Sequence, residues 1–132
     1  MNFLEKQMKI LFGESELFYD AMFCGKMMIG KIDNDVRVKL EFVSTEIKNH
    51  YNAIRTTVIN RTDGVIDIAT FHMKDIIGTK CGNDTYIWDN DERQDWYGFN
   101  ITGSEQEKIS DKIHDYMSMF ANEDLNYQMR TF

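Results

Sequence analysis

The side chains best suited to chemistry in this chain are two cysteines and three histidines. Cysteine and histidine can bind zinc together, and a thiol beside an imidazole can act as a nucleophile. None of the five shows close ligand spacing such as Cys-x-x-Cys or His-x-x-x-His, so their positions predict no metal or catalytic site. Two distant cysteines also make no disulfide framework. We expect reduced, buried thiols and surface imidazoles at these positions, which are Cys24, Cys81, His50, His72 and His114.

The acidic run at residues 89–92 offers oxygens of the kind that calcium prefers. An EF-hand loop that starts at Asp89 needs a glycine at its sixth position and a glutamate at its twelfth. This chain has Gln94 and Asn100 at those positions. The run therefore predicts a solvated hairpin tip, and we expect no metal ligand, no cofactor and no catalytic residue.

The densest aromatic group follows residue 84 and comprises Tyr86, Trp88, Trp96, Tyr97 and Phe99. Cross-strand packing in a small sheet explains such a group most simply. If the side chains are exposed, they would anchor a protein partner, because Trp and Tyr dominate the hot spots of interfaces. These five residues are the candidate partner-binding residues.

The charge balance argues against a protein that binds nucleic acid by neutralising phosphates. The chain has 15 basic and 22 acidic residues and a net charge of −7. No apolar stretch approaches the roughly 20 residues that span a bilayer, and the N-terminus lacks the pattern of a secretory signal. We expect a cytoplasmic protein that binds neither nucleic acid nor membrane, and whose partner is a protein or its own copy.

Apolar spacing predicts a helix near each end of the chain. Residues 3–12 form a short amphipathic pattern that ends at Gly13. Towards the other end, Thr102 with Glu105, or Ser104 with Glu107, supplies a capping box. The helix that follows is expected to run for about 17 residues. Its apolar side chains at helical spacing are Ile109, Ile113, Tyr116, Met117 and Phe120.

The strands are predicted from alternation and from β-branched residues. Residues 36–42 give the clearest pattern, in which apolar side chains alternate with charged ones. Residues 17–24 are apolar on both faces, which predicts a buried or partner-covered strand. Residues 74–84 are expected to be mainly loop. Other strands are expected at residues 27–32, 85–88 and 96–99.

The chain is organised around a hairpin between residues 51 and 73, with its turn at Thr62-Asp63-Gly64. A two-residue loop would pair Thr62 with Val65 and leave both faces mixed. A three-residue loop instead pairs Arg61 with Val65, and we favour this register because it gathers the larger apolar set on one face. That face would hold Ile54, Thr56, Val58, Ile66, Ile68 and Thr70, with Val58 opposite Ile68. Arg55, Arg61 and Asp67 would lie on the other face, which would also hold Ile59 and Val65, so the separation is incomplete.

These elements together predict one α+β domain over residues 1–121, followed by a C-terminal tail at residues 122–132. The domain is expected to have an antiparallel sheet of six or seven strands, a short N-terminal helix, and a C-terminal helix packed on one face of the sheet. A chain of 132 residues is long enough to bury a stable core.

Five stretches carry a resemblance: residues 37–43, residues 59–67, Tyr86-Ile87-Trp88, Trp96-Tyr97 and residues 115–120. With them, most of residues 22–121 is similar to a family of short, uncharacterised bacterial proteins that are often encoded in integrative mobile elements of Firmicutes. The resemblance implies a cytoplasmic accessory protein of such an element. It implies no catalytic or ligand residues, because the family has no known activity.

Three hypotheses of function follow. The first is a non-enzymatic protein-binding or accessory module that uses a sheet face or the aromatic hairpin. The second is a small enzyme or ligand-binding protein with a pocket between the sheet and the C-terminal helix, using His72, Cys81 or Asp95. The third is an acidic mimic of nucleic acid that blocks a DNA-binding partner, which the net charge of −7 suggests.

Overall fold

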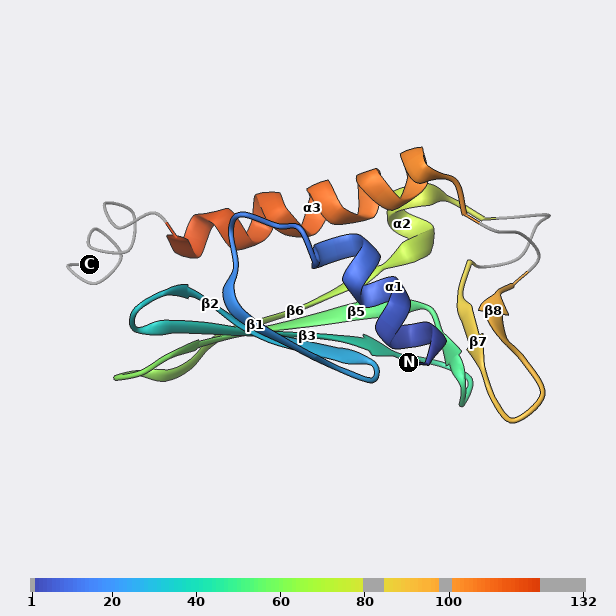
Figure 1. Ribbon diagram of the computed structural model, residues 1–132, viewed down its shortest axis with the longest axis horizontal. Helices are drawn as coiled ribbons and strands as arrows, with labels where there is room; N and C mark the ends of the chain where they lie inside the picture. Colours follow the sequence, from blue (N-terminus) through green and yellow to red (C-terminus); the bar gives the residue numbers. More distant parts are fainter. Residues whose placement is uncertain (1, 80–84, 98–100, 122–132) are drawn as a thin grey trace.

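The computed structural model describes residues 2–79, 85–97 and 101–121 (Figure 1). Two sheets and three helices make up the described part. In chain order they are α1 (Phe3–Phe12), β1 (Tyr19–Cys24), β2 (Met27–Asp33), β3 (Val36–Val43), β4 (His50–Tyr51), β5 (Ala53–Asn60), β6 (Gly64–His72), α2 (Met73–Ile77), β7 (Ile87–Asp89), β8 (Gln94–Trp96) and α3 (Gly103–Ala121).

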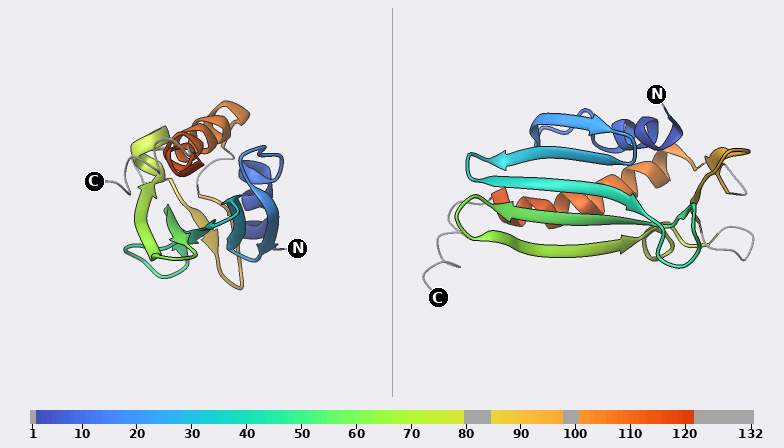
Figure 2. Two further views of the ribbon diagram at one scale, coloured as in Figure 1. Left: turned by 90° about the vertical axis from the view of Figure 1, so that its left-hand side faces the viewer. Right: turned by 90° about the horizontal axis from the view of Figure 1, so that it is seen from below.

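The larger sheet has five antiparallel strands in the order β1-β2-β3-β5-β6. Both α1 and α3 lie on one side of it, which we call the inner face (Figure 1). The expected α+β fold, with a helix at each end of the domain and α3 on one face of the sheet, is confirmed. The other side is the outer face, and the view from below shows its strands in front of α3 (Figure 2).

Three short strands, β4, β7 and β8, form a second sheet at one end of the molecule (Figure 1). The sequence had predicted a single sheet of six or seven strands. The chain leaves the large sheet after β3 through a polar stretch, and Asn49 takes a left-handed conformation with φ of 67° just before β4. Asn tolerates this conformation better than most residues. The turn directs β4 towards β7 instead of leaving it in line with β5.

The core lies between the inner face and the two long helices. Strand β3 places every second side chain inward, as its alternation predicts. From the helix side, α3 buries one stripe of residues at helical spacing. The strand contributes Val36, Val38, Leu40 and Phe42, and the helix contributes Ile109, Ile113, Met117 and Phe120.

The capping box at the start of α3 is confirmed. The Glu105 amide donates to the Thr102 hydroxyl at 3.1 Å, and the Thr102 amide donates to the Glu105 carboxylate at 3.0 Å. Within the described residues, the helices are too short or too polar to cross a membrane.

A polar contact joins α1 to α3 across 99 positions of sequence. The Ser110 hydroxyl donates to the Leu11 carbonyl at 2.8 Å, where α1 ends. His114 donates from Nδ1 to the Ser110 carbonyl at 2.7 Å, which leaves Nε2 to accept from the Ser15 hydroxyl at 2.6 Å. The ring also packs against Phe12. His114 is therefore a half-buried structural residue, and the prediction of a surface imidazole is wrong for it.

The predicted register of the central hairpin is wrong by one residue. Ile68 lies opposite Thr57, and Val58 lies opposite Asp67, instead of Val58 opposite Ile68. A β-bulge between Val58 and Ile59 shifts the pairing near the turn. Val58 lies opposite Asp67 and Ile59 lies opposite Val65, so Ile66 is the extra residue of the bulge.

The one-residue difference exchanges the two faces of β6 but not those of β5. On β5, Ile54, Thr56 and Val58 are buried and Arg55 is exposed, as predicted; Arg61, which follows the strand, is exposed too. On β6, Asp67 turns to the inner face, opposite Val58. The predicted burial of this strand is therefore wrong, and its exposed residues include Ile66, Ile68 and Thr70.

Two further predictions need correction at the ends of the large sheet. Strand β1 is an edge strand, and five of its six residues are exposed, including Cys24. Burial of this strand and of its thiol within the domain is therefore wrong, whereas cover of the strand by a partner stays a prediction. After β6 the chain forms the short helix α2 at Met73–Ile77, where the sequence suggested loop. Met73 is fully buried, so packing supports a helix that the local sequence does not announce.

The exchanged faces of β6 can be tested by paired substitutions. Val58→Ala should lower the free energy of unfolding by about 2 kcal/mol, because it removes two methyl groups from a filled site. Ile68→Thr should change it by less than about 0.5 kcal/mol, because the side chain is exposed and stays β-branched. Urea unfolding at low protein concentration measures both. Similar losses for the two variants would contradict the observed register.

Candidate partner-binding surface

The small sheet separates its side chains onto two faces by strand register. Ile87 lies opposite Trp96, and both side chains are buried against the domain. Trp88 lies opposite Asp95 on one side and His50 on the other. Since side chains alternate along a strand, Trp88 and His50 point away from the core that holds Ile87.

Trp96 belongs to the core, although the sequence grouped it with the candidate partner-binding residues. Its side chain is only 4% exposed. The indole Nε1 donates to the Gln7 side-chain oxygen at 3.1 Å, so α1 satisfies the one polar atom of the ring. This bond fixes the small sheet to α1, and Trp96 is not available to a partner.

Four rings gather on the outward side of the small sheet, and we call them the aromatic face: His50, Tyr86, Trp88 and Tyr97. Tyr86 stacks on His50 with 4.3 Å between ring centroids and on Tyr97 with 4.7 Å, and both pairs are within 10° of parallel. Trp88 lies at an angle to all three, at 5.4 to 6.3 Å. All four side chains are half-buried, so each keeps part of its surface towards solvent.

A charged pair lies beside these rings. The Arg93 guanidinium is 4.5 Å from the Trp88 ring centroid and donates to the Asp95 carboxylate at 2.8 Å. Stacking on the ring and pairing with Asp95 both favour one orientation of this side chain. Trp88 therefore already holds a cation on one side.

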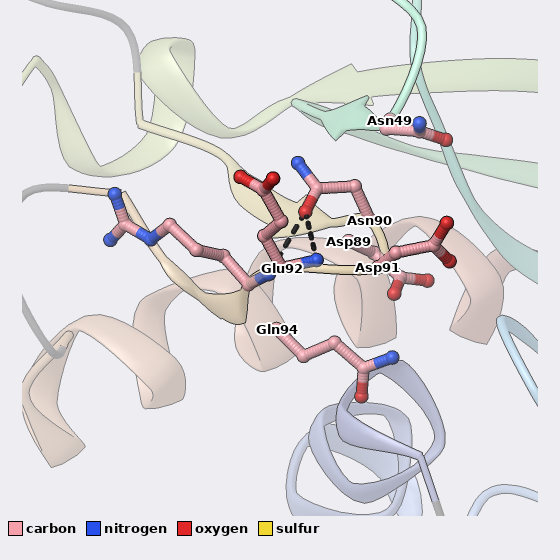
Figure 3. Close-up of a pocket in the computed structure, with 7 residues that line it drawn as sticks. Asn49, Asp89, Asn90, Asp91, Glu92 and Gln94 are labelled. Carbon is pink, nitrogen blue, oxygen red and sulfur yellow. Dashed lines mark hydrogen bonds between the residues drawn. The ribbon is translucent and has the colours of Figure 1, made fainter.

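The acidic run forms the tip of the β7–β8 hairpin, as predicted (Figure 3). The Asn90 side-chain oxygen accepts from the Glu92 and Arg93 amides and so closes the turn. A shallow concavity of about 500 Å³ lies here, lined by residues 89–94 and Asn49. The Glu92 carboxylate points away from those of Asp89 and Asp91. In the described ranges, no three His, Cys, Asp or Glu side chains come together as a metal site would need.

The surroundings of Tyr86 change the pKa of its phenol group. Partial burial raises the pKa of Tyr86 above the ordinary tyrosine value of 10.0, and the neighbouring Tyr97 and Asp95 raise it further, while Arg93 lowers it. The ring therefore stays a neutral hydrogen-bond donor at physiological pH.

The residues proposed for an enzymatic pocket do not form one constellation among the described residues. His72 ends β6 in the large sheet, and Asp95 lies in β8 of the small sheet, paired with Arg93. Cys81 and Phe99 lie outside the described residues. Between the inner face and α3, the described residues form the hydrophobic core of the domain. His50 was not among the predicted partner-binding residues, because β4 is two residues long and follows a polar stretch that gives no local signal.

Comparison of the chain with protein-family profiles, with curated proteins and with solved structures gives no match.

Removing the buried partner of Trp96 should weaken the attachment of the small sheet. Gln7→Ala leaves the indole N–H unsatisfied, so we expect a loss of about 1–2 kcal/mol in the free energy of unfolding. The matched control is Gln94→Ala, which removes an exposed amide and should change stability by less than about 0.5 kcal/mol. Chemical denaturation followed by tryptophan fluorescence measures both. Equal effects of the two variants would show that the Gln7 bond contributes nothing.

Alkaline titration tests the environment of Tyr86. The folded protein favours the protonated phenol, so this contribution to stability is complete below the pKa of an unfolded tyrosine and is lost as the pH rises through the folded pKa. Tyr86→Phe should remove a phenolate absorbance step that lies above the ordinary tyrosine pKa. Near-ultraviolet absorbance of the variant and the wild type measures this. A lost step at or below the ordinary value would contradict the described environment.

Proposed function

We propose that this chain is a non-enzymatic protein-binding module whose contact surface is the aromatic face. The supporting observation is the stack of His50, Tyr86 and Tyr97 on the side of the small sheet that faces solvent. Rings of this kind supply large contact areas at low cost in conformational entropy, which is why they dominate hot spots. The small sheet gains its own attachment from its other face, through Trp96.

The surroundings of the aromatic face favour a partner segment with both apolar and basic side chains. A hollow of about 60 Å³ lies between Ile47, His50 and Tyr86, with Glu46 and Asn52 completing its lining. Ile47 is 56% exposed, so this hollow has an apolar wall and suits one small aliphatic group. On the other side, the hairpin tip carries acidic side chains that attract Lys or Arg.

This proposal retains a cytoplasmic location and the accessory role that the sequence resemblance implies. Both stay predictions. The module would act by holding a partner, since the described rings form stacked pairs and an arginine-capped tryptophan, which are features of recognition.

The double variant Tyr86→Ala/Trp88→Ala tests the proposal. In cells, proteins cross-linked to the wild type and identified by mass spectrometry should be lost from the double variant. A control variant, Ile10→Ala, removes an apolar side chain that is 49% exposed on α1 and should retain them. For a purified partner, binding should weaken at least about tenfold in the double variant, as hot-spot losses do. Circular dichroism confirms that the fold is kept.

Salt dependence gives a second measurement of the same proposal. A basic partner segment should bind less tightly as salt rises, because screening weakens its attraction to the acidic hairpin tip.

Cross-linking partners that are identical for the wild type, the double variant and Ile10→Ala would exclude the aromatic face as the contact surface.

A further inference from the structure

The outer edge of β6 is an unusual feature of the large sheet. Within the described ranges, β6 has a single neighbour, β5, and so its other edge carries unpaired backbone groups. Soluble proteins usually protect such an edge with lysine, proline or a very short strand. β6 has nine residues, no lysine, no proline and one formal charge, at Asp67.

The exposed side chains of β6 make this edge apolar. We call Val65, Ile66 and Ile68 the aliphatic stripe; they are 57%, 41% and 58% exposed. Figure 2 shows β6 along one margin of the sheet, with the outer face open to the viewer. A long, apolar, unguarded edge is a template for pairing with another strand.

Hydrogen bonds elsewhere in the sheet show which groups of β6 point outward. The Arg61 amide donates to the Asp35 carbonyl, and the Met73 amide donates to the Asn52 carbonyl. Successive residues of a strand point their N–H and C=O groups to opposite sides. In the observed register, Asp67, Ala69 and Phe71 therefore bond to β5. The N–H and C=O groups of Ile68 and Thr70 consequently point to the free edge.

We propose that β6 pairs antiparallel with β6 of a second copy of this chain, about a two-fold axis at Ala69. Ile68 then lies opposite Thr70 of the second copy, and the reverse pair forms by symmetry. These are the residues whose backbone groups point outward, so the two pairs form four hydrogen bonds. The result is a continuous ten-stranded sheet, twice the five strands of one copy.

Charge favours this register over those whose two-fold axis lies closer to Asp67. An axis at Asp67 would place two carboxylates directly opposite each other, which is unfavourable. With the axis at Ala69, Asp67 lies opposite Phe71, and the two copies of Asp67 are separated by four residues along the strand, about 13 Å. That distance exceeds the screening length of about 8 Å at physiological salt. Small alanine side chains meet at the axis itself.

Net charge predicts how the pairing responds to salt. Each copy carries a net charge of −7, so two copies repel each other at long range. Salt screens this repulsion, and the dimer should therefore tighten as ionic strength rises. A basic partner at the aromatic face should instead bind less tightly as ionic strength rises. Because the two salt responses have opposite signs, a failure of one proposal can be distinguished from a failure of the other.

Sedimentation velocity of the full chain over a concentration series, at low and high salt, tests the pairing. The wild type should shift from monomer to dimer as protein concentration rises. Ile68→Lys should weaken the dimer at least about tenfold, because each copy then carries a lysine at the β6–β6 contact. The matched control is Met22→Lys on the opposite edge of the sheet. Met22 is 71% exposed, so the control makes the same change on β1 and should dimerise normally.

Amide hydrogen exchange by NMR reports on the backbone. The amides of Ile68 and Thr70 should gain protection as protein concentration rises, while those of Asp67 and Ala69 are already bonded in the monomer and should change little. Three results would overturn the proposal: a monomer at every concentration and salt, a dimer lost in Met22→Lys but kept in Ile68→Lys, or a dimer without protection of Ile68 and Thr70.

Discussion

The packing of α3 on one face of the large sheet determines the rest of this structure. The helix buries Ile109, Ile113 and Met117 completely, against strand residues that are equally buried. Burying a side chain of this size contributes about 1.5–3 kcal/mol before entropy is counted. One helix of 19 residues covers one face only. Every side chain that the sequence assigns to the other face must therefore suit water or a partner.

The small sheet follows the same rule of one covered face on a smaller scale. The buried side of the small sheet is fixed to α1 by the hydrogen bond between Trp96 and Gln7. Trp88 directly follows the buried Ile87, and side chains alternate along a strand, so the Trp88 ring and the other rings of the aromatic face must point outward. The aromatic face is thus a geometric result of anchoring the other side. Its rings then stabilise one another by stacking, at centroid distances of 4.3 and 4.7 Å.

Prediction from sequence succeeded where one physical signal was clear. β3 alternates apolar and charged residues without interruption, and α3 begins at a capping box, so both were predictable. β6 has apolar residues at both odd and even positions, so its pattern does not indicate which face is buried. Its register depends on the bulge beside Val58, which no local sequence signal marks.

The candidate site was only partly visible in the sequence for a similar reason. Tyr86 and Trp88 are two positions apart, so the sequence alone predicts that they lie on the same face of a strand. Pairing Trp96 with Ile87 requires the hairpin register, and this pairing sends Trp96 inward. His50 reaches the stack from a strand far away in sequence, through the left-handed turn at Asn49. Contacts of this kind are tertiary, and no periodicity in one segment can report them.

The bond between Ser110 and the end of α1 has a consequence for how the chain is made. The two helices meet across 99 positions, so a chain growing on the ribosome completes α1 and all of the large sheet long before α3 exists. During that interval, the inner side of the strands, including Leu40 and Val58, has no cover from α3. Chains that close by such distant contacts fold slowly and expose apolar surface meanwhile. Nascent copies of this protein should therefore be clients of ribosome-associated chaperones until the last helix emerges.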